Sequence, residues 1–226
     1  MTVVEEVVEV FSQNAEAYDS WYRTPAGSAV LEAEASLLDL LLPRGVGADI
    51  GAGTGVFAEK LSENREIVCL DPSEPMLRLA RGRCQHLVVG VGEQPPLRSG
   101  SLSFAYMVTV LEFLENPRKV LESVRGLLRE GGVLAVLSIE RESPWGQLYR
   151  RLASENLDPV LAKAKFYSRR EAEDFLLEAG YSISTRAWAL DYEPLAVPEG
   201  KPRLYVDEEC LRCGVYALVA KPLHFQ

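Results

Sequence analysis

The sequence predicts an α/β protein built on a mostly parallel sheet, and two observations support this prediction. Short apolar runs alternate with segments whose apolar residues recur at helical spacing. This alternation is typical of parallel strands joined by right-handed crossovers, with helices on both faces of the sheet. The glycine-rich segment 51–55 connects the first apolar run to the helix that follows, and such a turn lets a ligand approach the backbone.

Each element follows from a local pattern. Strands are expected near residues 46–50, 66–70, 86–89, 102–108 and 133–139. Helices are expected near residues 28–42, 55–63, 74–82, 117–129 and 169–179. Pro43 ends the first of these helices, because proline cannot continue a helical hydrogen-bond ladder.

The C-terminal third is less regular. Two further strands are expected at 182–190 and 214–220, separated by the proline-containing segment 191–209. Residues 140–168 carry aromatic and leucine side chains that indicate one or two extra helices. The pair Cys210 and Cys213 supplies at best half of a zinc site, so no metal site is expected. A turn before the last strand and a reversible disulfide both stay open for this pair.

Bulk properties exclude several classes of protein. A chain of 226 residues can bury one good core, or a core plus a small cap. Its formal net charge of −9 opposes nucleic-acid binding, which depends on Lys and Arg contacts with phosphates. The first 11 residues include three glutamates, unlike a basic signal peptide, and no apolar run approaches the length that spans a bilayer. We therefore expect a cytoplasmic protein without a membrane span.

The glycine segment indicates an adenosine cofactor. A dinucleotide-binding loop would have its third glycine at position 56, which is Val56, and no Lys-Ser or Lys-Thr pair completes a phosphate-binding loop. Asp71 lies 20 residues after Gly51, at the end of the next apolar run. An acidic side chain at this place can accept hydrogen bonds from both hydroxyls of a ribose.

These motifs together resemble the class I S-adenosylmethionine (SAM)-dependent methyltransferases, in particular the small-molecule branch that includes the ubiquinone/menaquinone biosynthesis methyltransferases. The resemblance is carried by segments 48–55, 70–73 with Met76, 90–97, 101–104 and 130–132. Segment 130–132 is similar to the turn that precedes the fifth strand. Val91 and Ala105 replace aspartates that are usual in the family.

The resemblance implies a Rossmann-like, seven-stranded, mostly parallel sheet with helices on both faces and the last strand antiparallel. It implies one methyltransferase domain over residues 1–226. An N-terminal helical arm, residues 1–45, would cover the cofactor, and the helical insert 140–168 would cap the acceptor site.

The resemblance also implies the residues that bind the cofactor. These are Tyr18, Tyr22, Asp49, Gly51, Ala52, Gly53, Thr54, Gly55, Asp71, Pro72, Met76, Gly92, Glu93 and Thr109. Glu140, Trp145 and Tyr149 are candidates for the acceptor pocket. No catalytic residue is assigned, since His86 and His224 have no partner in the sequence that would make either a base.

The implied reaction is methyl transfer from SAM to a small-molecule acceptor, with S-adenosylhomocysteine (SAH) as the product. A protein or RNA methyltransferase is an alternative, although the acidity and the lack of a Pro-Pro motif at 109–112 weigh against RNA. A non-catalytic SAM-binding protein and, through the same loop, an NAD-dependent oxidoreductase are the others. A homodimer stays open.

Overall fold

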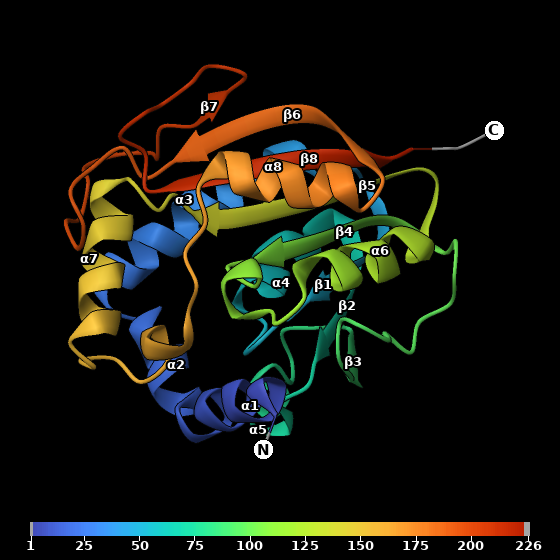
Figure 1. Ribbon diagram of the computed structural model, residues 1–226, viewed down its shortest axis with the longest axis horizontal. Coiled ribbons are helices and arrows are strands. Elements are labelled where there is room, and N and C mark those ends of the chain that lie inside the picture. Colours follow the sequence, from blue (N-terminus) through green and yellow to red (C-terminus); the bar gives the residue numbers. More distant parts are fainter. Residues whose placement is uncertain (1, 224–226) are drawn as a thin grey trace.

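One mixed sheet of eight strands organises residues 2–223, the part of the chain that the computed structural model describes. Met1 and residues 224–226, which include His224, lie outside it. The spatial order is β3-β2-β1-β4-β5-β8-β6-β7 (Figure 1). The strands are β1 Gly45–Ile50, β2 Arg65–Asp71, β3 His86–Val89, β4 Leu102–Val108, β5 Leu128–Ile139, β6 Tyr181–Ala189, β7 Tyr205–Val206 and β8 Val215–Pro222.

Helices cover both faces of this sheet. The α-helices are α1 Val3–Gln13, α2 Ala15–Trp21, α3 Pro25–Leu41, α4 Val56–Leu61, α5 Glu74–Leu79, α6 Pro117–Leu127, α7 Pro144–Ser154 and α8 Arg169–Glu178. Short 3-10 turns are η1 Ser62–Asn64, η2 Leu111–Phe113 and η3 Leu161–Lys163. One buried cluster includes Leu37 and Phe57 from α3 and α4, and the other includes Val120 and Leu176 from α6 and α8.

The predicted topology is confirmed. Strands β1 to β5 pair in parallel, and the last strand, β8, lies antiparallel between β5 and β6. The strand beyond the seven expected is β7, whose two residues pair antiparallel with Ala187 and Trp188 of β6. Two residues are too few to show a strand pattern, and β7 lies within the segment expected to be a connection.

The fifth strand begins earlier than the sequence indicated. Residues 130–132 were expected to form a turn before this strand, but they lie inside β5. The register between β4 and β5 shifts there, because Leu102 pairs with Leu128 whereas Phe104 pairs with Val133. The extra residues therefore form a bulge, which a glycine with positive φ such as Gly131 accommodates.

Two disulfides link the four cysteines. Cys69 is fully buried in β2, and it bonds to Cys84, which follows α5. The sequence did not predict this bond, because a separation of 15 residues matches no motif. Cys210 and Cys213 bond to each other at the turn before β8, so the turn and the disulfide coexist.

No helix in residues 2–223 combines the length and the apolar character needed to cross a bilayer. Over the same residues, His, Cys, Asp and Glu side chains form no group of three that could hold a metal ion.

A buried ion pair attaches the N-terminal arm to the turn after α5 and, through it, to the glycine loop. Asp19 of α2 is only 2% exposed, and its carboxylate accepts hydrogen bonds from Arg83 and Arg23. Arg83 also donates to the carbonyl oxygen of Thr54 in the glycine loop, over 2.9 Å. The bond from Arg83, with a smaller contribution from Arg23, lowers the pKa of Asp19 to about 2 despite its burial. The arm and the loop are thus held by one guanidinium group.

We expect Asp19→Asn to lower the free energy of unfolding by roughly 1.5–3 kcal/mol, the usual value for a hydrogen bond to a charged group. Because the pKa of Asp19 is lowered on folding, its contribution is full above the ordinary pKa of an aspartate and disappears as the pH falls towards 2. Urea denaturation between pH 2 and 7 measures both effects. The exposed Asp174 on α8 supplies the control, Asp174→Asn. Equal stability of the two variants at pH 7 would contradict a stabilising role for the Asp19–Arg83 ion pair.

Candidate functional site

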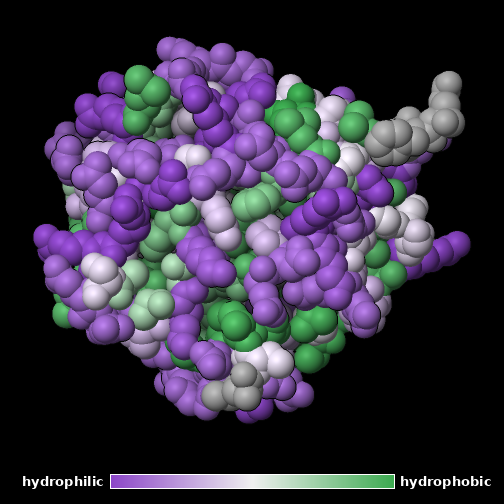
Figure 2. All heavy atoms as spheres, viewed as in Figure 1, coloured by the Kyte–Doolittle hydropathy of each residue, from purple (hydrophilic) through white to green (hydrophobic). Residues whose placement is uncertain are grey.

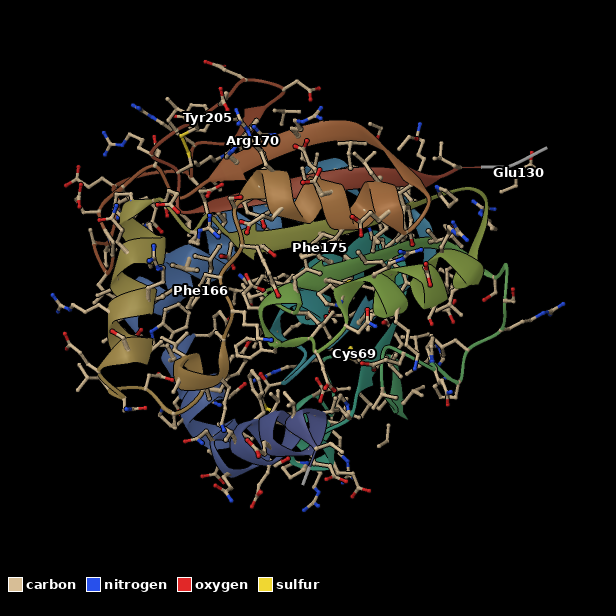
Figure 3. All side chains as sticks on the ribbon, in the orientation of Figure 1. Cys69, Glu130, Phe166, Arg170, Phe175 and Tyr205 are labelled. Carbon is tan, nitrogen blue, oxygen red and sulfur yellow. A yellow bond between two sulfur atoms is a disulfide. The ribbon has the colours of Figure 1, made fainter. Side chains whose placement is uncertain are left out.

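A cavity of about 510 Å³ lies at the carboxyl ends of β1, β2, β4 and β5. Such an edge is where ligands bind in open α/β sheets. The first two helices, α1 and α2, close one side, and α7 with η3 closes another (Figure 1). Phe166, on the segment between η3 and α8, belongs to the wall (Figure 3). On the face drawn in Figure 2, hydrophobic residues lie among hydrophilic ones. Several hydrophobic residues gather in the lower part of this view, where α1 lies.

Asp71 connects the glycine loop to the helix after β2. One carboxylate oxygen accepts a hydrogen bond from the backbone N–H of Gly53, and the other accepts one from Ser73, each over 2.8 Å. Burial raises the pKa of Asp71, and these two bonds oppose the rise. Each oxygen has two lone pairs, so the carboxylate can still accept two hydroxyl groups.

Gly53 leaves room for a ligand against the backbone. Its φ is +53°, a conformation that favours glycine, and it lies in the cavity wall. A Cβ atom there would stand 3.7 Å from the Tyr18 ring and 3.8 Å from the methyl group of Met76. A side chain at position 53 would therefore fill the space between Tyr18 and Met76.

The cavity brings together most of the residues expected to bind the cofactor. Those in its wall are Tyr18, Tyr22, Gly51, Gly53, Asp71, Pro72, Met76, Gly92, Glu93 and Thr109. Asp49, Ala52, Thr54 and Gly55 are not part of this wall. Burial raises the pKa of Asp49 to about 8, and one of its oxygens, Oδ2, has no hydrogen-bond partner among the described residues. A Cβ at Gly55 would come within 3.0 Å of Ala80 and Cys84, so that glycine lets α4 pack closely.

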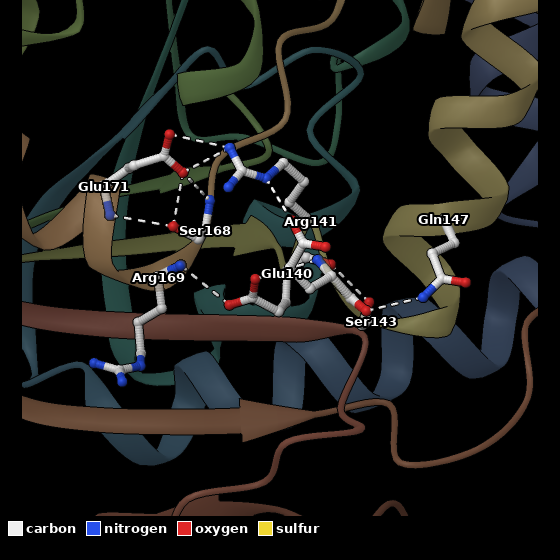
Figure 4. Close-up of polar contacts among 8 residues, drawn as sticks. Glu140, Arg141, Ser143, Gln147, Ser168, Arg169 and Glu171 are labelled. Carbon is white, nitrogen blue, oxygen red and sulfur yellow. Dashed lines mark hydrogen bonds and ion pairs between the residues drawn. The ribbon is translucent and has the colours of Figure 1, made fainter.

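The acceptor candidates separate in the same way. Trp145 and Tyr149 of α7 lie in the wall, but Glu140 does not. The Glu140 carboxylate accepts a hydrogen bond from the backbone N–H of Arg169 over 3.0 Å, at the start of α8 (Figure 4). Arg141, beside it, pairs with Glu171 on the same helix. Glu140 and Arg141 therefore position α8 relative to the end of β5.

Two buried carboxyl groups of the wall were missed by the sequence analysis. Glu34 of α3 is 4% exposed and Glu112 of η2 is 1% exposed. The Glu112 carboxylate accepts a hydrogen bond from the backbone N–H of Ile139 over 3.0 Å. A signal for Glu34 was present, since it stands on the apolar stripe of the helix expected at 28–42, between Val30 and Leu38.

Comparisons with known proteins agree with this geometry. A family model described as a methyltransferase domain matches residues 48–136. An uncharacterized protein of Methanocaldococcus jannaschii is 30% identical over 174 residues, 77% of this chain and 82% of the relative. An uncharacterized protein of Mycobacterium tuberculosis is 33% identical over 187 residues and 80% of this chain, which spans 63% of that relative's length.

A solved structure from Thermotoga maritima is similar over nearly the whole chain. It is described as a SAM-dependent methyltransferase, possible histamine N-methyltransferase. The two share 27% identity with a TM-score of 0.85, over 95% of this chain and 99% of the other. With the glycine loop and Asp71 at the expected edge of the sheet, these similarities show that the chain belongs to the class I SAM-dependent methyltransferases.

Proposed function

We propose that this protein transfers a methyl group from SAM to a small-molecule acceptor. The observation that carries the proposal is the cavity, which joins the Gly51–Gly53 loop and Asp71 to a second, aromatic region under α7. Its volume of about 510 Å³ lies in the range of small-ligand sites, about 300–1,000 Å³. The helices α1, α2 and α7 border this cavity, which suits a small molecule.

The residues present fit SAM. In the proposal, Asp71 accepts the ribose hydroxyls, and Gly53 lets the cofactor pass between Tyr18 and Met76. Gly92 and Glu93 lie beside the adenine, and Thr109 lies beside the methionine end. When bound, SAM supplies an electrophilic methyl group on a sulfonium ion. The chain contributes alignment and exclusion of water, which supply much of the rate of such a transfer.

The proposal extends to the domain and its relatives. Residues 1–226 act as one methyltransferase domain, in which the arm 1–45 covers the cofactor and the insert 140–168 caps the acceptor. The motif resemblance to ubiquinone/menaquinone methyltransferases and the description of the Thermotoga protein both support a small-molecule acceptor.

The first test is cofactor choice. We expect calorimetry to give micromolar binding of SAH and SAM and no binding of NADH. Asp71→Ala should weaken SAH binding at least tenfold, because the ribose hydroxyls lose their acceptor, whereas Asp174→Ala should leave it unchanged. Failure of the wild-type protein to bind either SAM compound would refute the proposed function. An unchanged affinity in Asp71→Ala would refute the ribose contact alone.

The second test is the space beside Gly53. Gly53→Ala should lower SAH affinity at least tenfold, because the new methyl group enters the cavity. Gly100→Ala is a matched control, since Gly100 has a similar φ of +63° and open space around its Cβ position. Both variants should lose roughly 1–2 kcal/mol of stability from the left-handed backbone. Equal SAH affinity in the two variants would argue against a cofactor at Gly53.

A further inference from the structure

The charged residues of the cavity wall are all acidic. Among the described residues that form it, these are Glu34, Asp71, Glu93, Glu112, Glu115 and Asp158. Lys, Arg and His are absent from the same set. Asp71 and Glu93 belong to the proposed cofactor side; the other four acidic groups disfavour a carboxylate or phosphate on an acceptor and favour a cation.

Among these acidic residues, Glu34 gives the strongest indication of a bound ligand. Its carboxyl group lies in the wall at 4% exposure, and no hydrogen bond within residues 2–223 perturbs it. The charge that acts on it is that of another carboxyl, Glu112, whose Oε2 atom is itself buried without a partner. Buried carboxyl groups are normally paired or hydrogen-bonded, so the Glu34 carboxyl group, which lies in the cavity wall without a hydrogen bond from the described part of the chain, indicates a missing partner.

Aromatic side chains complete this part of the cavity. Tyr18, Tyr22 and Tyr149 lie in the wall; burial raises the pKa of each hydroxyl, and the charge of Glu34 raises it further. The Tyr18 and Tyr22 hydroxyl oxygens are 3.2 Å apart, and Tyr149 packs edge-on against Trp145. Carboxylates together with aromatic faces form the usual environment for a nitrogen cation.

We propose that the acceptor of the methyl group is an amine, and that Glu34 binds its nitrogen beside Tyr18, Tyr22 and Tyr149. This inference rests on the proposed methyltransferase function and adds the chemical class of the acceptor. Glu112 supplies a second carboxyl group. We define the amine subsite as Tyr18, Tyr22, Glu34, Glu112 and Tyr149. Trp145 packs against Tyr149 and is not part of the subsite.

The Glu34 carboxylate can also accept the proton that the reaction releases. An ammonium nitrogen has no free lone pair, so its proton first moves to the Glu34 carboxylate. The freed lone pair then forms the N–C bond, while the C–S bond of SAM breaks and its electron pair stays on sulfur. The products are neutral sulfur in SAH, a methylated ammonium and one proton, which leaves Glu34 for solvent.

The protonation of Glu34 suits this role. Burial, and to a smaller extent Glu112, raise the pKa of Glu34 to about 8, and burial raises the pKa of Glu112 to about 7. Four tyrosines also feel the charge of Glu34, namely Tyr18, Tyr22, Tyr149 and Tyr192; burial raises the pKa of each hydroxyl further above 7, so all four are neutral at pH 7. In the free protein at pH 7, Glu34 is therefore mostly protonated. Binding of an ammonium ion should lower its pKa and release a proton.

The experiment measures binding of amines and matched alcohols to the SAH-loaded protein. The probes are 2-phenylethylamine and hexylamine, compared with 2-phenylethanol and hexan-1-ol. We expect at least one amine to bind at least tenfold more tightly than its alcohol. Calorimetry at pH 7 in buffers of different ionisation enthalpy should show release of close to one proton per amine. Glu34→Gln should lose the tenfold preference and most of the proton release, with SAH affinity within twofold of wild type.

Glu32→Gln is the matched control, because Glu32 lies on the exposed side of the same helix and pairs with Lys60. It should behave as the wild type in every measurement. SAH binding without any preference for amines, or a preference that survives in Glu34→Gln, would overturn the amine subsite and leave the proposed function standing. Loss of SAH binding by the wild-type protein would instead refute the proposed function.

Discussion

The hydrogen bonds of the Asp71 carboxylate are the constraint on which the site depends. They join the end of β2 to the glycine loop after β1 and to the first turn of α5, through Gly53 and Ser73. Two neighbouring parallel strands thus present their loops at one edge of the sheet with a fixed separation. Asp71 also lies in the cavity wall and its carboxylate keeps lone pairs free, so one group both builds the loop and remains available to a ligand.

Basic and acidic groups occupy different places around the cavity. Basic groups are used to fasten the elements around it, as in the attachment of α2 by Arg83 and the positioning of α8 by Arg141. The wall itself holds only acidic charged groups among the described residues. Burying Glu34 and Glu112 without cations raises their pKa values to about 8 and 7, so the protein reduces the unfavourable charge by protonation. A bound cation would replace that proton.

The arm and the insert determine what reaches this edge. Asp19 fixes α2 against the glycine loop through Arg83, so Tyr18 of α2 and Tyr22, the residue after it, line the same cavity as Gly53 and Glu34. The Ser143 hydroxyl accepts a hydrogen bond from the backbone N–H of Gly146 and so caps α7, which directs Trp145 and Tyr149 into the cavity. Packing of two segments far apart in sequence therefore shapes the acceptor side.

The sequence by itself determined the parallel sheet, the antiparallel last strand and the edge that holds Gly53 and Asp71. These follow from local periodicity and short motifs, which a single sequence displays directly. It did not determine β7, whose two residues carry no pattern, or the Cys69–Cys84 bond.

Only the tertiary structure decided where Asp49, Gly55 and Glu140 lie relative to the cavity, and it places all three outside the wall. Glu34 shows the physical reason most directly. Its position on an apolar helical stripe was visible, but whether a buried carboxyl meets a cation, a hydrogen-bond donor or an open cavity depends on side chains from α2, η2 and α7, which only folding brings together.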